Sequence, residues 1–112
     1  MRAIILDELR KEEIERIDNY LKNETTSSNI EGLYWLYLKN SELSENQKKL
    51  ETQAGPYRIS IEIGQNFVRF ELLVRAEMIT NEGGGEADEN QLLYIYRFIN
   101  KMAHALNLTT CL

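Results

Sequence analysis

Apolar and polar residues alternate from Pro56 to Ala76, in the segment PYRISIEIGQNFVRFELLVRA. Successive side chains of a strand point to opposite faces of a sheet, so this alternation predicts two strands that each bury one face. A turn at Gln65-Asn66 would join them into an antiparallel hairpin. Its inner face would then hold four apolar pairs: Ile63 with Val68, Ile61 with Phe70, Ile59 with Leu72, and Tyr57 with Val74.

The charged residues of this hairpin fall on its other face. Glu62 would lie opposite Arg69, and Arg58 diagonally from Glu71, so the charges form complementary pairs. Exposed pairs of this kind contribute about 0–1 kcal/mol each. A catalytic pair of carboxylates would need an apolar pocket to separate their pKa values, and the neighbouring sequence does not supply one. We therefore interpret this face as the solvated side of a sheet.

A second strand pattern lies in GLYWLYLK, residues 32 to 39, which is apolar without interruption from Leu33 to Leu38. Its aromatic residues favour a strand over a helix. Both faces of this strand would be bulky, with Leu33, Trp35 and Tyr37 on one and Tyr34, Leu36 and Leu38 on the other. A sheet with one solvated side needs only one apolar face. Either both faces are covered within the chain, or one of them is left for a partner or a ligand.

Three segments have helical patterns. In LDELRKEEIERIDNYLKN, residues 6 to 23, Asp7 could cap a helix with one narrow apolar stripe. A short helix from about Glu45 to Gln53 would begin at a capping box formed by Ser44 and Gln47. The last helix would be capped by Asp88 with Gln91 and run to about Asn107. Its apolar stripe consists of Leu92, Ile95, Tyr96, Ile99, Met102, Ala103 and Leu106, beside which lie Tyr94 and Phe98.

These elements predict an α+β fold in one domain over residues 1–112. The expected architecture has two layers, with a small antiparallel sheet of about three strands and the N- and C-terminal helices packed on one of its faces. The hairpin needs a third strand to be stable, and the segment of residues 32 to 39 is the best candidate.

The loop TNEGGGEADEN, residues 80 to 90, contains three consecutive glycines. It lacks the spacing and the lysine of a phosphate-binding loop, and its acidic residues would repel an anion. The order of acids found in calcium-binding loops is also absent. We interpret it as a flexible connection, with a weak cation site as the alternative.

Composition and charge narrow the function further. Thirteen Lys and Arg against eighteen Asp and Glu give a net charge of −5, which disfavours nucleic-acid binding. The chain shows neither a signal-peptide pattern nor a membrane-spanning run, and Cys111 has no partner for an internal disulfide, so we expect a cytoplasmic protein. With His104 and Cys111 as its only histidine and cysteine, the sequence offers no metal or cofactor motif and no nucleophilic constellation.

The first functional interpretation is therefore a non-catalytic interaction protein, adaptor or chaperone-like. The alternative is a small-molecule-binding domain or a small enzyme with an aromatic-lined pocket, because acid–base chemistry by Glu, Asp or Tyr stays open. The candidate binding residues, for an interface or a pocket, are Tyr34, Trp35, Tyr37, Tyr57, Phe67 and Leu73.

Self-association is the expected mode of interaction. The residues from Leu33 to Leu38 are apolar on both faces, Phe67 and Leu73 interrupt the charged side of the hairpin, and the last helix has a wide apolar surface. Uncovered apolar area of this kind usually marks an interface. We expect a homodimer that forms either through paired edge strands or through sheet faces in contact, and a protein partner in addition.

Overall fold

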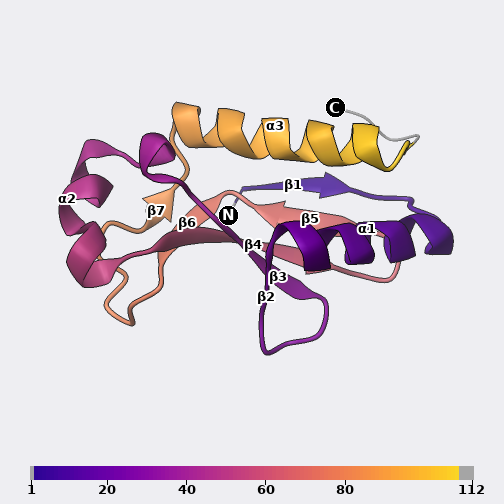
Figure 1. Ribbon diagram of the computed structural model, residues 1–112, viewed down its shortest axis with the longest axis horizontal. Coiled ribbons are helices and arrows are strands. Elements are labelled where there is room, and N and C mark those ends of the chain that lie inside the picture. The colour runs from indigo at the N-terminus through magenta and orange to yellow at the C-terminus, as the bar shows by residue number, and fades with distance from the viewer. Residues whose placement is uncertain (1, 109–112) are drawn as a thin grey trace.

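The computed structural model describes residues 2–108 and has an α+β architecture with three α-helices and seven antiparallel strands (Figure 1). The helices are α1 (Lys11–Glu24), α2 (Glu45–Ala54) and α3 (Glu89–Ala105), and a 3₁₀ turn, η1, spans Asn40–Glu42. The strands are β1 (Ala3–Leu6), β2 (Thr26–Ser27), β3 (Leu33–Tyr37), β4 (Tyr57–Ile63), β5 (Val68–Glu71), β6 (Leu73–Ala76) and β7 (Gly85–Glu86). The expected count of about three strands is therefore wrong.

The sheet follows the order β1-β5-β4-β3-β2, and the long strand β4 lies at its centre. Beyond β5, the same side of β4 pairs with β6, which in turn pairs with β7. The four additional strands are each two to four residues long. Three of them, β1, β2 and β7, carry too few alternating positions to be recognised from periodicity. The fourth, β6, lies within the segment predicted as the second strand of the hairpin, which the structure divides into β5 and β6.

The predicted hairpin is confirmed near its turn. Ile61 lies opposite Phe70 and Ile63 opposite Val68. Further along, Tyr57 lies opposite Ala76 instead of Val74. The register changes where β5 ends and β6 begins, because this side has two more residues between Phe70 and Arg75 than β4 has between Arg58 and Ile61. There the N–H of Leu72 donates to the carbonyl of Arg2, and its carbonyl accepts from Ala87 (3.0 Å each). Two additional residues are thus accommodated between β5 and β6.

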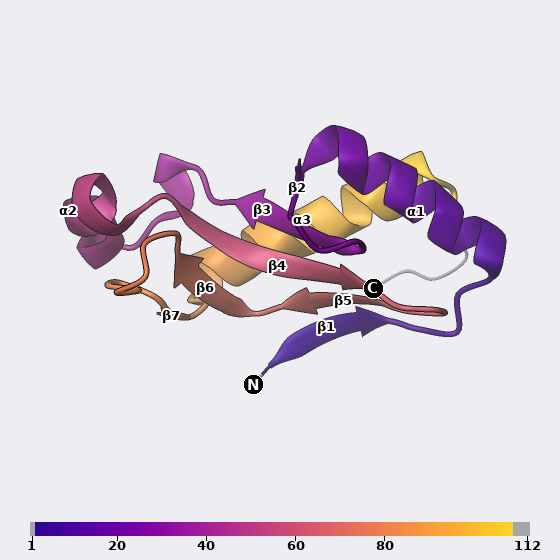
Figure 2. The ribbon, with the colours of Figure 1, turned by 90° about the horizontal axis from the view of Figure 1, so that it is seen from below.

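The alternation of β3 is also confirmed. Tyr34 and Leu36 are buried, whereas Leu33, Trp35 and Tyr37 on the other face are half-buried. The buried face joins one hydrophobic core with Ile17 and Leu21 of α1 and with Ile95, Ile99 and Met102 of α3. Figures 1 and 2 show both helices running alongside the sheet.

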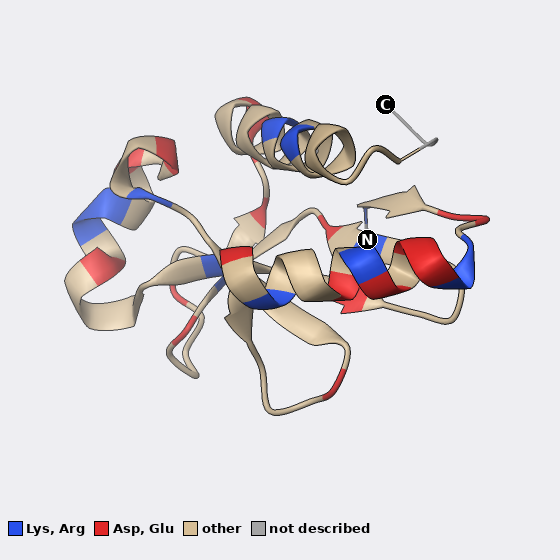
Figure 3. Ribbon diagram, turned by 45° about the vertical axis from the view of Figure 1, so that its right-hand side comes forward, with Lys and Arg blue, Asp and Glu red and all other residues tan. Residues whose placement is uncertain are grey.

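Two of the three helix starts match the prediction. Ser44 and Asp88 cap α2 and α3, and each accepts a hydrogen bond from the backbone of the residue three positions later. Helix α1 starts later than expected, because Glu8 takes a φ of 53° and the chain enters the helix at Lys11. Acidic and basic residues are interspersed along this helix (Figure 3).

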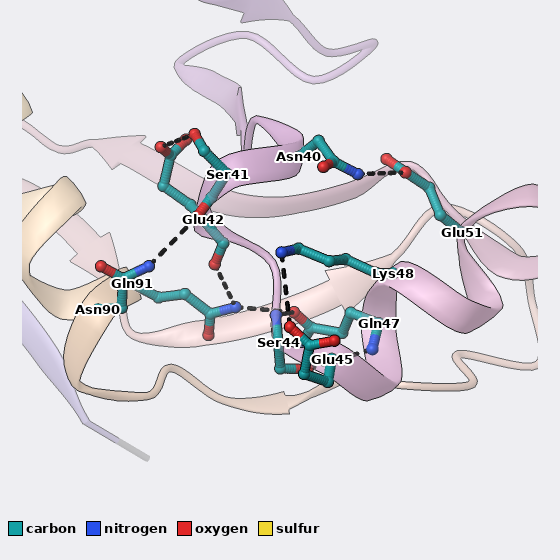
Figure 4. A network of polar contacts seen from close by, with 10 residues as sticks. All are labelled: Asn40, Ser41, Glu42, Ser44, Glu45, Gln47, Lys48, Glu51, Asn90 and Gln91. Carbon is teal, nitrogen blue, oxygen red and sulfur yellow. Dashed lines mark hydrogen bonds and ion pairs between the residues drawn. The ribbon is translucent and has the colours of Figure 1, made fainter.

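The two capping glutamines bond to each other in the interior (Figure 4). The Gln91 side-chain amide donates to Gln47 Oε1 (2.7 Å) and to the carbonyl of Glu42 (3.1 Å), while Gln47 donates to the carbonyl of Gly83 (2.9 Å). The first turns of α2 and α3 are thereby joined to the glycine loop. That loop contains the two-residue strand β7 and is anchored to α2 by the bond to Gly83; its flexibility stays a prediction.

The last helix differs from the expected stripe at one position. Tyr96 is 40% exposed, whereas Tyr94 and Phe98 are half-buried and pack against the core. His104 is exposed, as expected, and Cys111 lies outside the described residues. None of the helices in residues 2–108 has the length and apolar content needed to span a bilayer.

Candidate functional site: the open face of the sheet

The face of the sheet opposite the core, called the open face below, carries the aromatic and charged residues of interest. Strand register places the following side chains on it: Ala3, Ile5, Thr26, Leu33, Trp35, Tyr37, Arg58, Ser60, Glu62, Arg69, Glu71, Leu73, Arg75 and Glu86. All seven strands contribute to this set, so the surface is built by long-range pairing rather than by one segment.

Arg58 lies over the ring of Trp35 on this face. Its guanidinium carbon is 3.8 Å from the ring centroid, a cation–π stack. One terminal nitrogen also donates to the hydroxyl of Tyr37 (3.1 Å) and to Glu77 (3.3 Å). Arg58 Nε is the one buried side-chain polar atom in residues 2–108 without a hydrogen-bond partner. The stack therefore fixes two large side chains at the cost of one unsatisfied donor.

A second ionic cluster lies beside this stack. Arg75 donates twice to Oε1 of Glu71 (2.9 and 3.1 Å), and Arg69 lies 3.7 Å from Oε2 of the same carboxylate. Glu71 is buried between the two arginines. Glu62, although opposite Arg69 in the register, is exposed. The predicted complementary charges are present, but they pair along β5 and β6 more than across the hairpin.

Two shallow hollows flank Trp35. One, of about 390 Å³, lies between the ring and the loop that joins β2 to β3. The other, of about 360 Å³, is bordered by Ser60, Glu62 and the Glu71 cluster. Trp35 thus separates two depressions. Such a surface suits the side chains of an opposing protein better than it suits one enclosed small molecule.

The structure separates the candidate binding residues. Trp35, Tyr37 and Leu73 share the open face. Tyr34 and Tyr57 lie in the core, where Tyr34 donates to Asp18 (2.5 Å) and Tyr57 to the carbonyl of Glu82 (2.8 Å). Burial raises the pKa of both tyrosines, chiefly because it disfavours the charged phenolate. The four aromatic residues Tyr34, Trp35, Tyr37 and Tyr57 therefore do not line a common pocket.

Phe67 lies in the turn between β4 and β5. Its ring covers Gly64 so closely that a Cβ there would come within 2.0 Å of the ring, which explains why glycine occupies that position. Phe67 thus shapes the turn and is not part of the Trp35 surface.

Arg58 is the residue of this site that the sequence interpretation missed. It was assigned to a solvated ion pair, whereas it lies over an aromatic ring. A signal was available: with β3 and β4 paired, Arg58 falls opposite Tyr37 and next to Trp35. Arginine beside aromatic residues on neighbouring strands favours stacking.

A further hollow of about 470 Å³ separates α1 from the β2–β3 loop. Asp18 lines this hollow. Its Oδ1 accepts a hydrogen bond from the hydroxyl of Tyr34, and its Oδ2 lies 3.1 Å from Nζ of Lys22. Both carboxylate oxygens are thus engaged within the chain. The described residues contain no group of three or more His, Cys, Asp or Glu side chains that could hold a metal ion.

Comparison of the chain with protein-family models, with curated proteins and with solved structures found no significant match.

Proposed function

We propose that this chain is a small, cytoplasmic, non-catalytic interaction protein, adaptor or chaperone-like, that acts as a homodimer. In this proposal α1 and α3 form one layer on the core face of the sheet, and the open face is left to bind a protein partner. No nucleic acid is expected as partner, because the net charge is −5.

The stack of Arg58 on Trp35 is the observation that carries the proposal. Tryptophan, tyrosine and arginine are the residues most enriched among those that dominate binding energy at protein interfaces. Here Arg58 contacts both of the others, since it lies over Trp35 and donates a hydrogen bond to Tyr37. Because these contacts already hold the three side chains in place, they would lose little conformational entropy when a partner binds.

The chemistry of the partner follows from the same face. Leu33 and Leu73 offer apolar contact on either side of Trp35, while the arginines are balanced by Glu62, Glu71 and Glu77. A face with both signs of charge suits a protein surface that also carries both signs. It suits a polyanion poorly, since the arginines are already paired.

The alternative of a ligand-binding domain or small enzyme has less support. It required Tyr34 and Tyr57 to join Trp35 in one pocket, and both are buried in the core. Glu71 is the buried carboxylate of the open face. It is paired with Arg69 and Arg75, which leaves it poorly placed to transfer a proton to a ligand.

Affinity capture with matched variants tests the proposal. Immobilised wild-type protein should retain a stoichiometric partner, and Trp35→Ala should weaken that binding by about 2 kcal/mol or more. Ile79→Ala is the control, because Ile79 is fully exposed in a loop outside the open face. Capture that Trp35→Ala leaves unchanged would contradict the role of the open face. Strong thermal stabilisation by a metabolite would instead favour the ligand-binding alternative.

A further inference from the structure

We infer that the homodimer forms through the outer edge of β1, which pairs antiparallel with β1 of a second copy and joins the two sheets into one. This inference rests on the self-association in the proposed function and assigns its surface. Strand β1 is the last strand on its side of the sheet, and no other strand within residues 2–108 pairs with its outer edge.

At that edge, the backbone of β1 presents groups that no residue within 2–108 pairs with. Leu72 N–H donates to the carbonyl of Arg2, so Arg2 and Leu72 form a hydrogen-bonded pair of the β1–β5 ladder. Such pairs alternate with non-hydrogen-bonded ones in an antiparallel ladder. Ile4 and Leu6 therefore bond to β5, and the N–H and C=O groups of Ala3 and Ile5 point outward.

The two edges of the sheet differ in how they are protected. The opposite edge, β2, consists of two exposed polar residues, Thr26 and Ser27. The β1 edge has the sequence AIIL, with no proline and no charged residue, and Ile5 is 51% exposed. Proteins usually protect an edge with charges, proline or very short strands. An apolar edge without charges is a template for another strand.

A second copy fits this edge better than an unrelated strand does. The backbone groups of Ala3 and Ile5 both point outward. If a two-fold axis passes between Ile4 of one copy and Ile4 of the other, Ala3 of each copy lies opposite Ile5 of the other. Each large side chain then meets a small one on the open face. On the neighbouring strands, Glu71 and Arg69 are the partners of Ala3 and Ile5. Each pair of Ala3 with Ile5 of the other copy would therefore have Glu71 on one side and Arg69 of the other copy on the other side.

Helix α3 adds apolar surface on the same side. Tyr94 and Phe98 point toward α1 and β3, since Tyr94 donates to the carbonyl of Tyr37 and Phe98 contacts Tyr20. Tyr96 is two residues from Tyr94, which turns it by about 200° around the helix axis. It therefore points toward the β1 side of the sheet. The exposed Tyr96 and its neighbour Leu92 would face the same residues of the second copy.

The arrangement has a consequence for partner binding. A two-fold axis perpendicular to the sheet keeps both open faces on one side, so the dimer would present two Trp35–Arg58 stacks on a continuous surface. A partner could then engage both copies at once, which raises its apparent affinity.

Sedimentation equilibrium with three variants tests the assignment. Ile5→Lys places a charge in the seam, and Ile5→Pro removes an outward N–H without removing a hydrogen bond to β5. Each should raise the dimer dissociation constant by about tenfold or more. Ile79→Lys, at an exposed isoleucine away from β1, should leave it unchanged. Circular dichroism would verify that each variant folds.

A cysteine pair tests the register independently of stability. In a Cys111→Ser background, oxidation of a mixture of Ala3→Cys and Ile5→Cys chains should give a cross-linked heterodimer, and either chain alone should give much less. A wild-type dimer that Ile5→Lys and Ile5→Pro do not weaken, with no preference for the mixed disulfide, would overturn the β1 assignment and leave self-association standing. A wild-type monomer at every concentration would overturn both.

Discussion

At the scale of single residues, Tyr34 shows how one side chain connects the sheet to α1. The side chain is 3% exposed, and its hydroxyl donates to Asp18, whose other oxygen pairs with Lys22. Burial, followed by the hydrogen bond to Asp18 and the negative charge of that carboxylate, raises the pKa of Tyr34 above its ordinary value. The folded chain therefore resists ionisation of this phenol.

A pH dependence of stability follows from this shift. Below about pH 10 the phenol is protonated in both folded and unfolded chains, and its stabilising contribution is fully present. Above that pH the unfolded chain releases the proton while the folded chain retains it, so the free energy of unfolding falls. Tyr34→Phe should lose less stability than wild type between about pH 9 and pH 11 in urea denaturation. Equal losses would contradict the assigned role of Tyr34.

At the scale of elements, the bonded pair Gln47 and Gln91 connects two helices at their N-termini. Each glutamine completes a capping box, since its Oε1 accepts from the backbone N–H of its own cap residue (3.0 Å each), and the two side chains also bond to each other. A buried amide that loses its partner retains its full desolvation cost. The pair should therefore behave as one unit.

A double-mutant cycle measures this coupling. Gln91→Ala alone should destabilise the fold by about 1–3 kcal/mol, because Gln47 Oε1 and the carbonyl of Glu42 lose a donor. The loss in Gln47→Ala/Gln91→Ala should be smaller than the sum of the two single losses by about 0.5–3 kcal/mol. Chemical denaturation supplies all the values. Strict additivity would show that the hydrogen bond between them contributes nothing.

The same scale shows what the sequence could predict of the fold. The capping boxes of α2 and α3 and the faces of β3 and β4 are local patterns, and they were recognised. The register failed where the backbone of Leu72 bonds to Arg2 and Ala87, residues distant from the hairpin in sequence. Strand β1 was missed for a similar reason, because a four-residue apolar segment becomes a strand through pairing with β5.

At the scale of the whole molecule, the candidate site depends on which residues share a surface. Alternation placed Trp35 and Tyr37 on one face of their strand and Tyr34 on the other, yet an aromatic pocket needed both faces. The position of Arg58 over Trp35 follows from the pairing of β3 with β4. That pairing joins segments separated by α2, and no local pattern encodes it.

The molecule is elongated along its strands. The chain measures 42 × 28 × 25 Å, with strands, α1 and α3 extended along its length in Figures 1 and 2. Pairing of β1 with a second copy would extend the molecule across the strands and would leave the open face uncovered. In the proposed arrangement, the protein would act as a dimer whose open faces both stay available to a partner.

Amide hydrogen exchange, followed residue by residue by NMR at low and high protein concentration, tests whether β1 pairs with a second copy. The outward N–H groups of Ala3 and Ile5 should exchange rapidly in the dilute monomer and become protected as the concentration rises. Thr26, on the opposite edge of the sheet, should not change. Rapid exchange of Ala3 and Ile5 at every concentration would contradict the account.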